Sequence, residues 1–132
     1  MFPSFANQEA IEYCQQSMTI AEELGDRYCE AFAWDSLGYS HHHLSQYPQA
    51  IGCYRRAVAL HRAIGDRDAE STVQIHLMDA LRATGDIDAA RAAGKEALAI
   101  LEELGHSDAD SVRAELDQLN RVPMNGDDGL VR

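Results

Sequence analysis

Apolar residues recur along most of the chain at spacings of three and four, the period of one buried stripe on an α-helix. In the first run they are Ile11, Cys14, Met18, Ala21 and Leu24. No segment has the strict alternation of apolar and polar residues expected of a half-buried strand. The pattern therefore predicts an all-α fold. The expected helices span residues 7–24, 27–44, 47–64, 67–84, 87–104 and 109–121.

Three of the helix boundaries carry the same dipeptide, because Gly-Asp occupies positions 25–26, 65–66 and 85–86. Glycine ends a helix in the left-handed conformation, and an aspartate after it caps the next helix by accepting a backbone N–H. At another boundary, Ser45 is a plausible N-cap, and Pro48 falls in the first turn, where its missing N–H costs nothing. Turns this short predict antiparallel neighbours.

The chain repeats itself with a shift of forty residues. The Leu-Gly-Asp-Arg turn at 24–27 returns as Ile-Gly-Asp-Arg at 64–67 and as Leu-Gly-His at 104–106. A fixed period of this size is typical of a solenoid, whose units cover their apolar faces by stacking. We expect one repeat domain over residues 7–121, a short lead-in at 1–6 and a disordered tail at 122–132.

One stretch combines large and small residues at fixed spacings: Trp34, Leu37, Gly38, Ala50, Tyr54 and Ala57. In residue type and spacing it resembles the tetratricopeptide repeat signature, with His41 where the signature has tyrosine. The small residues let two antiparallel helices approach closely, while the large ones fill the space beside them. The resemblance implies a right-handed α-solenoid of antiparallel helix pairs, here with about six helices.

The second repeat departs from this signature, because Met78 replaces a glycine and Gly94 replaces the aromatic residue. A large-for-small exchange at one helix contact would conserve volume, so we expect Met78 and Gly94 to touch. The period of forty also exceeds the usual 34. Long repeats with this turn look similar to those in bacterial multidomain regulators, including transcriptional activators, although none of the DNA-binding or ATP-binding motifs of those regulators is present.

Charge and composition exclude several classes of function. The net charge of −11, from 11 basic and 22 acidic residues, argues against binding of nucleic acid. No nucleophile elbow, P-loop, dinucleotide-binding or metalloprotease motif is present, so we expect neither an enzyme nor a cofactor. The acidic residues, as around Lys95 and Glu96, are interpreted as solvated helix faces.

The cysteines and histidines have ordinary explanations. The chain has three cysteines, Cys14, Cys29 and Cys53, an odd number without the spacing of a metal site. We interpret them as small buried residues in a reducing compartment. The triplet His41-His42-His43 cannot converge on one ion, because consecutive helical residues point about 100° apart. We expect no metal. No leader peptide and no run of about 18 apolar residues occur, which predicts a cytoplasmic protein without a membrane segment.

The resemblance also implies that the first helix of each pair lines a concave groove. Helical phase separates the packing stripe from a second stripe that faces this groove. The predicted partner-binding residues are Phe32, Asp35, Tyr39, His42, Thr72, Ile75, Asp79 and Arg82. The groove lacks the paired Lys and Asn that clamp a terminal carboxylate in some family members. We expect a protein or peptide partner with a neutral or basic amphipathic segment; an ordinary solvated face is the alternative.

The order of the helices leaves the ends of the array open to two interpretations. The closing helix has a polar outer face suited to a cap: Arg113, Glu115, Asp117, Gln118 and Arg121. The opening helix lacks its partner, so either the array continues or this face is covered by another chain or by the lead-in Phe2-Pro3-Ser4-Phe5. We favour an array that continues beyond this chain, or a domain boundary, over a homodimer through the opening helix, which Ile11→Glu would dissolve. A structural or oligomerisation element acting through these ends is the alternative function, and a small-molecule sensor is a third.

Overall fold

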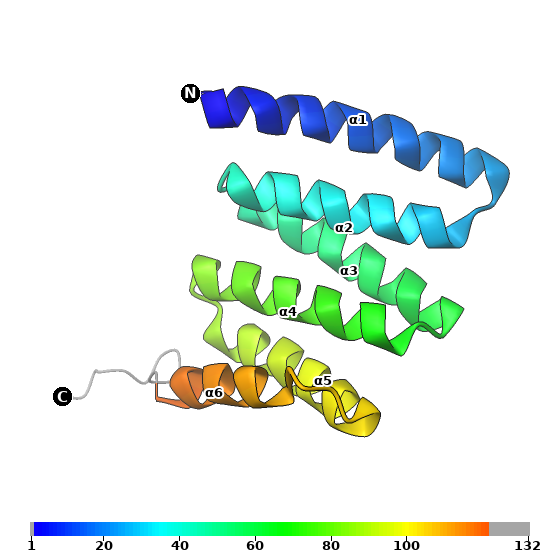
Figure 1. The fold of residues 1–132 in the computed structure, drawn as a ribbon. Helices are drawn as coiled ribbons and strands as arrows, with labels where there is room; N and C mark the ends of the chain where they lie inside the picture. The colour runs from blue at the N-terminus through cyan, green and yellow to red at the C-terminus, as the bar shows by residue number, and fades with distance from the viewer. Residues whose placement is uncertain (1, 122–132) are drawn as a thin grey trace.

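A computed structural model gives the structure of residues 2–121, with side chains from residue 7. Its helices are α1 (Phe2–Leu24), α2 (Arg27–His43), α3 (Tyr47–Ile64), α4 (Arg67–Thr84), α5 (Ile87–Leu104) and α6 (Ala109–Asn120). No strand occurs between residues 2 and 121. Each helix packs against the next, and the pairs stack from α1 at one end to α5 and α6 at the other (Figure 1). The predicted all-α, tetratricopeptide-like solenoid is confirmed.

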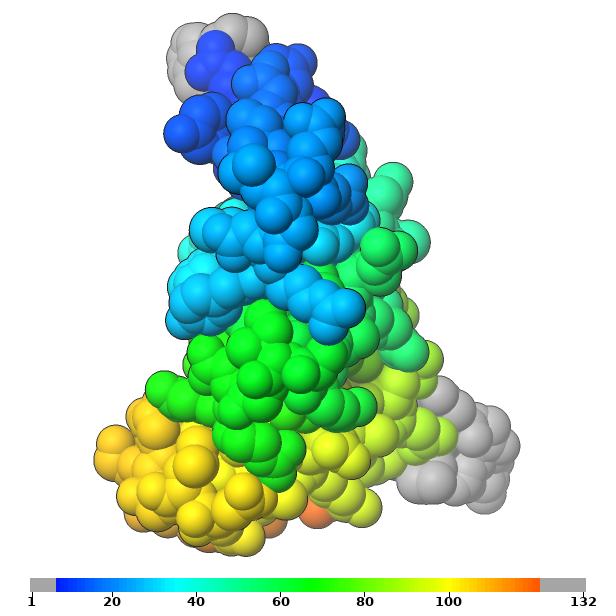
Figure 2. Space-filling view, turned by 90° about the vertical axis from the view of Figure 1, so that its right-hand side faces the viewer, coloured from blue at the N-terminus to red at the C-terminus, as the bar shows by residue number. Residues whose placement is uncertain are grey.

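The layers follow the order of the chain. In the space-filling view of Figure 2, residues of α1, α2, α4 and α5 succeed one another from one end of the molecule to the other. Helices α2 and α4 also contact each other directly, although α3 lies between them in sequence. This contact places the first helices of successive pairs side by side, which is the arrangement that a continuous groove requires.

The predicted helix boundaries hold within one residue for α2 to α6, but the start of α1 is wrong. Helix α1 begins at Phe2 rather than near residue 7, so the expected lead-in is helical from residue 2. Pro3 is compatible with this start because the first turn of a helix leaves its N–H groups unpaired in any case. The expected disordered tail at 122–132 lies outside the described residues.

The Gly-Asp turns act as predicted. The carboxylates of Asp26, Asp66 and Asp86 each accept a hydrogen bond from the backbone N–H three residues on, at 3.1, 3.1 and 3.2 Å. The glycine before each of them has a positive φ of 70°, 89° or 87°. These three turns therefore end one helix and begin the next with the same local geometry.

The turn between α2 and α3 differs from the prediction. Ser45 is not the N-cap, because Gln46 occupies that position and makes no side-chain capping bond. Ser45 instead adopts a φ of 60°, the left-handed conformation that glycine supplies at the other turns. Pro48 lies in the first turn of α3, as predicted.

Close helix packing in both repeats depends on a glycine against a large side chain. A Cβ atom added to Gly38 would lie 2.7 Å from the Tyr54 ring. A Cβ atom added to Gly94 would lie 2.8 Å from the Met78 sulfur and 2.7 Å from Leu116. The expected contact between Met78 and Gly94 is therefore confirmed, and the large and small partners have exchanged helices between the two repeats.

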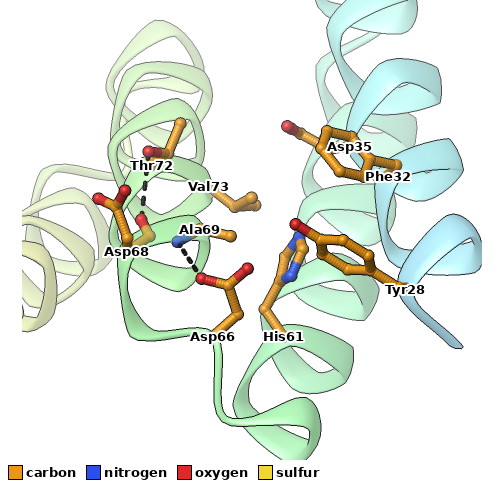
Figure 3. Close-up of a pocket in the computed structure, with 9 residues that line it drawn as sticks. All are labelled: Tyr28, Phe32, Asp35, His61, Asp66, Asp68, Ala69, Thr72 and Val73. Carbon is orange, nitrogen blue, oxygen red and sulfur yellow. Dashed lines mark hydrogen bonds between the residues drawn. The ribbon is translucent and has the colours of Figure 1, made fainter.

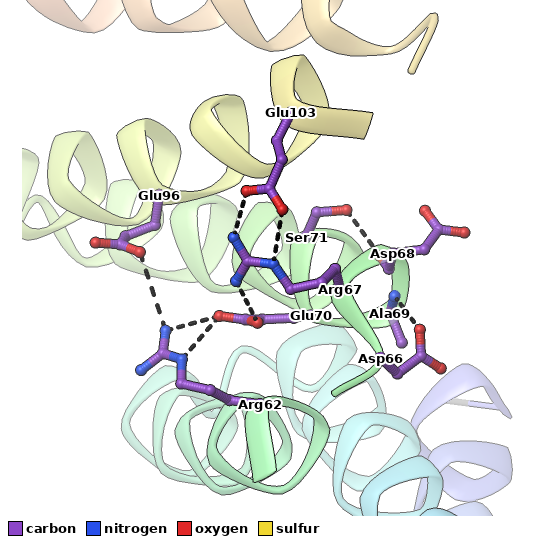
Figure 4. Close-up of polar contacts among 9 residues, drawn as sticks. All are labelled: Arg62, Asp66, Arg67, Asp68, Ala69, Glu70, Ser71, Glu96 and Glu103. Carbon is purple, nitrogen blue, oxygen red and sulfur yellow. Dashed lines mark hydrogen bonds and ion pairs between the residues drawn. The ribbon is translucent and has the colours of Figure 1, made fainter. Parts of the chain in front are cut away.

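One acidic side chain is buried rather than solvated. Glu70 on α4 is 1% exposed and accepts hydrogen bonds from Arg62 of α3 at 2.8 Å and from Arg67 at 3.1 Å. Arg67 also donates to Glu103 of α5 at 2.7 Å, so the chain of charges joins three helices (Figure 4). The interpretation of acidic residues as solvated faces is wrong for Glu70, because two guanidinium groups compensate its burial.

The cysteines also differ in part from the prediction. All three are free thiols, but only Cys53 is buried, whereas Cys14 is half-buried and Cys29 is exposed. Cys29 lies in the first turn of α2, where the N-terminal residues face solvent. Burial raises the pKa of the Cys53 thiol to about 11. Cys53 is therefore the one that behaves as a small apolar residue.

Candidate functional site

The groove along α2 and α4 is hollowed in two places, each with a volume of about 280 Å³. The first, which we name the Asp66 hollow, lies by the N-terminal halves of both helices. Its lining residues are Tyr28, Phe32, Asp35, His61, Asp66, Asp68, Ala69, Thr72 and Val73. The second, the His76 hollow, lies by the C-terminal halves. Its lining residues are Tyr39, His42, His43, Tyr54, His76 and Asp79.

Three segments build the walls of the Asp66 hollow (Figure 3). Tyr28 and Phe32 extend from α2, with their rings edge to face at a centroid distance of 5.4 Å. Asp66 and the first turn of α4 form the opposite wall. The His61 ring, from the last turn of α3, lies between these two walls and points toward the space between α2 and α4. The hollow thus has two aromatic rings and Asp35 on the side of α2, and the Asp66 and Asp68 carboxylates on the side of α4.

His61 is the most buried polar residue of this hollow. It is 2% exposed, and its Nδ1 atom has no hydrogen-bond partner. The rings of Tyr28 and Phe32 lie edge-on to the His61 ring, at centroid distances of 6.3 and 6.2 Å. A buried polar atom without a partner loses its hydration and gains nothing in return, a cost of about 1–3 kcal/mol. The position favours a ligand that can hydrogen bond there.

The charge of the Asp66 hollow is negative. Asp35, Asp66 and Asp68 contribute carboxylates, and none of the nine lining residues is Lys or Arg. One oxygen of Asp66 caps α4, and its second oxygen lies on the side of His61 (Figure 3). Asp68 lies 3.7 Å from His106 at the start of the next repeat. Carboxylates in a partly enclosed space attract a cation more strongly than they do in open solvent.

The His76 hollow contains a bond that joins α2 to α4. His76 Nδ1 lies 3.1 Å from the Asp35 carboxylate, and this hydrogen bond raises the pKa of His76 against the opposing effect of burial. Burial lowers the pKa of the neighbouring His42. The Tyr39 and Tyr54 rings lie 6.2 and 5.6 Å from the His76 ring. This half of the groove is aromatic, with a charge that depends on pH.

The comparison with protein families agrees with this architecture. A model described as tetratricopeptide repeat matches residues 7–63 and residues 30–103, which together cover most of the chain. The chain belongs to the tetratricopeptide repeat family. No curated protein matches the sequence. Tetratricopeptide repeats are generally non-catalytic modules that mediate contacts between proteins, and the face formed here by α2 and α4 belongs to the first helices of successive repeats.

Six of the eight residues predicted to line the tetratricopeptide groove contribute to the hollows. Phe32, Asp35 and Thr72 line the Asp66 hollow, and Tyr39, His42 and Asp79 line the His76 hollow. Ile75 and Arg82 line neither. Ile75 packs partly buried against the core, and Arg82 pairs with Asp79 at 3.6 Å and with Glu115 at 3.3 Å. The part these eight side chains play in binding stays a prediction.

The tetratricopeptide pattern predicted three of the nine residues that line the Asp66 hollow and missed the other six, Tyr28, His61, Asp66, Asp68, Ala69 and Val73. Tyr28 and His61 carried no motif, and Asp66 was assigned only to helix capping. His61 belongs to the second helix of its pair, a helix that the repeat pattern assigns to packing rather than to the groove. The signal that could have identified it is the period of forty, since Ala21 and Leu101 occupy the equivalent positions. A histidine among apolar equivalents indicates a departure from simple packing.

The histidine triplet does not converge on one site, although His42 and His43 both line the His76 hollow. His41 Nδ1 lies 2.6 Å from Gln46 Oε1, His42 lines the His76 hollow, and His43 stacks edge-on against Tyr39 at 4.3 Å. Within the described part of the chain, no three His, Cys, Asp or Glu side chains gather in a way that could hold a metal ion. Over the same residues, no helix is both long and apolar enough to cross a membrane.

Proposed function

We propose that this tetratricopeptide array is a non-catalytic interaction module that binds a neutral or basic segment of a protein partner, or of its own parent chain, along the α2–α4 groove. One observation carries the proposal. Both hollows combine exposed aromatic rings with carboxylates, and neither is lined by Lys or Arg. Aromatic anchors and complementary charge are the features by which grooves recognise peptide segments.

The spacing of the two hollows suits an extended segment. Phe32 and Tyr39 stand in different hollows and are seven residues apart on α2. At the rise of an α-helix this separation is about 10 Å. A segment in the extended polyproline II conformation covers it with about three residues and, with three residues per turn, keeps side chains i and i+3 on one face. We therefore expect side chains at positions i and i+3 of the segment to enter the two hollows.

A peptide array tests the proposal. Random ten-residue peptides with defined net charges are probed with the purified chain, and bound sequences are measured again in solution by fluorescence anisotropy. We expect enrichment in basic and aromatic residues, and about tenfold weaker binding after Phe32→Ala or Tyr39→Ala, both about half exposed. Arg55→Ala on the other face is the control. Acidic binders, or binding indifferent to Phe32 and Tyr39, would contradict the proposal.

We further propose that the module is the sensor or interaction part of a bacterial transcriptional regulator and acts in the cytoplasm. The support is the forty-residue period with its Leu-Gly-Asp-Arg turn. In such a protein the groove would hold an internal segment until a competing partner displaces it. The gene that encodes this chain tests the idea, because it should also encode a DNA-binding or nucleotide-binding region.

A specific observation supports a second function, association through the α1 end of the array. Tyr13, Ile20 and Leu24 on α1 are strongly exposed apolar side chains. A hollow of about 360 Å³ lies between α1 and α2, and Tyr13, Phe32 and the Cys14 and Cys29 thiols are among its lining residues. A second copy of the chain could cover this surface in a homodimer.

The variant expected to dissolve such a dimer must be chosen with the structure in view. Ile11 is buried against α2, so Ile11→Glu would unfold α1 instead of testing association. Ile20, which is 56% exposed, is the better position. Light scattering over a wide concentration range should give a dimer for the wild type and a monomer for Ile20→Glu. A monomeric wild type rules out this second function.

A further inference from the structure

We propose that the Asp66 hollow is a pocket for an arginine side chain of the bound segment. The proposal rests on the function proposed above and names the group that the groove selects. Three independent features of the hollow point to a cation with several N–H donors. They are its carboxylates, its aromatic wall and the unpartnered nitrogen of His61.

The carboxylates supply the charge. The second oxygen of Asp66 faces into the hollow, and Asp68 is 67% exposed at its rim. Asp35 pairs with His76, and Asp68 lies 3.7 Å from His106, so Asp66 is the most available acceptor. No Lys or Arg lines the hollow, so an arginine side chain of the segment would be the cation that meets these carboxylates.

The aromatic wall distinguishes arginine from a simple ion. Tyr28 and Phe32 are 48% and 53% exposed, so their rings offer apolar surface to a ligand. A guanidinium is planar, is more weakly hydrated than an ammonium and stacks on aromatic faces. Its aliphatic stem would cover part of the Phe32 ring while its head reaches Asp66.

His61 supplies the third feature. Its buried Nδ1 has no partner, and its ring is directed toward the hollow between Tyr28 and Asp66. A guanidinium presents five N–H donors in a rigid fork. One of them can satisfy Nδ1 when the exposed Tyr28 ring turns aside, while others pair with Asp66. The volume of about 280 Å³ lies below the usual range of cofactor pockets and suits one side chain.

The test uses blocked amino acids and the complete chain. N-acetyl-arginine methylamide is titrated while NMR records the backbone amide shifts and the ring nitrogens of the histidines. The lysine and citrulline analogues are the comparison probes, because citrulline keeps the shape of arginine without its charge. We expect saturable shifts at His61 and Asp66, with at least tenfold weaker binding of citrulline and weaker binding of lysine. Citrulline or lysine binding as tightly as arginine would overturn the proposal.

Matched variants separate charge from folding. Asp66→Asn keeps the oxygen that caps α4 and removes the charge, and we expect about tenfold weaker arginine binding. Asp26→Asn makes the same change in the equivalent cap of α2, outside the hollow, and should leave binding unchanged. Tyr28→Ala, at an exposed position, should also weaken binding. Equal effects of Asp66→Asn and Asp26→Asn would reject the site.

The outcomes also separate this inference from the proposed function. If basic peptides bind in a manner that depends on Phe32 and Tyr39 but not on Asp66, the groove function stands and the arginine pocket is wrong. If no peptide binds the groove and the arginine probe causes no shifts, both are wrong. Shifts of His61 in the wild type that Asp66→Asn abolishes would support the pocket directly.

Discussion

Gly38 and Tyr54 form a close helix contact in the first repeat, and Met78 and Gly94 form its counterpart in the second. In each case a backbone without a Cβ atom receives a buried side chain from the neighbouring helix. The interface therefore conserves the sum of the two volumes and not the residue at either position. Individual glycines inside these helices consequently differ in their importance, although the loss of helix propensity is the same for all of them.

We expect opposite effects from two glycine substitutions. Gly38→Ala should lower the free energy of unfolding by about 1–2 kcal/mol, because overpacking against the Tyr54 ring exceeds the gain in helix propensity. Gly52→Ala on α3, where a Cβ atom would meet nothing within 4 Å, should raise it by about 0.5–1 kcal/mol. Urea unfolding followed by circular dichroism measures both, and a stabilising Gly38→Ala would disprove the contact.

At the scale of elements, two of the polar links between helices differ in the groups that form them. The first, which we name the Glu70 cluster, consists of Arg62, Arg67, Glu70 and Glu103 and joins α3, α4 and α5. The second is the bond between Asp35 and His76, which joins α2 to α4. The first link is built on arginines, which stay protonated. The second depends on the protonation of a histidine. The two links should therefore respond differently to pH.

Removal of the buried charge should be costly. Glu70→Gln leaves Arg62 and Arg67 without their shared carboxylate, and we expect a loss of about 1–3 kcal/mol in unfolding free energy. Both arginines are partly exposed, so water limits the loss. Glu30→Gln, at the half-buried equivalent position in α2, is the matched control and should stay within about 0.5 kcal/mol of wild type. Equal losses would exclude a special role for the cluster.

The link through His76 should weaken as pH rises. The Asp35 hydrogen bond raises the folded pKa of His76, and Asp79 adds to this effect. Its contribution to stability is fully present below the unfolded pKa of about 6.5 and is lost as pH rises through the folded pKa. Two other titratable groups lie near His76: His42 of α2 lines the same hollow, and the Tyr54 ring packs beside the His76 ring.

Comparison with a variant isolates this effect. The free energy of unfolding is measured in urea from pH 5.5 to 8.5 for the wild type and for His76→Gln. The advantage of the wild type should be largest at the acidic end and should shrink as pH rises. A difference that stays constant across this range would show that the protonated ring adds nothing to the bond.

At the scale of the whole molecule, the array is a stack in which most contacts are between neighbours. Helix α1 packs mainly on α2, and α6 packs mainly on α5, whereas α3 and α4 have packed helices on both sides. The apolar residues Val112, Leu116 and Leu119 give α6 one buried face, and its outer face is polar, as a cap requires. In such a stack the ends open at a lower free energy than the centre.

Hydrogen exchange should reveal this gradient. We expect the slowest amide exchange in α3 and α4, and the fastest in α1 and α6, because an end helix opens without breaking two interfaces. Mass spectrometry of peptic fragments resolves the helices individually. Uniform protection from α1 to α6 would indicate that the array opens as a single cooperative unit.

The sequence was sufficient for features that local chemistry determines. The Gly-Asp turns located the helix ends, and the small residues at Gly38 and Ala50 located the close packing. It was insufficient where burial depends on residues distant in sequence. The burial of Glu70 requires Arg62 to reach it from the preceding helix, and the position of the buried His61 ring at the floor of the Asp66 hollow depends on how α2 and α4 pack around it. Neither follows from helical phase alone.

The scaffold of this array is periodic, but its groove is not. Forty residues after Tyr28, Phe32 and His61, the equivalent positions hold Asp68, Thr72 and Leu101. The next inter-repeat space therefore offers a different set of side chains from the Asp66 hollow. A surface with the period of its scaffold would let a bound segment slide by one repeat and settle in several registers. We therefore expect a segment bound as proposed to take a single register, and with it one direction along the array.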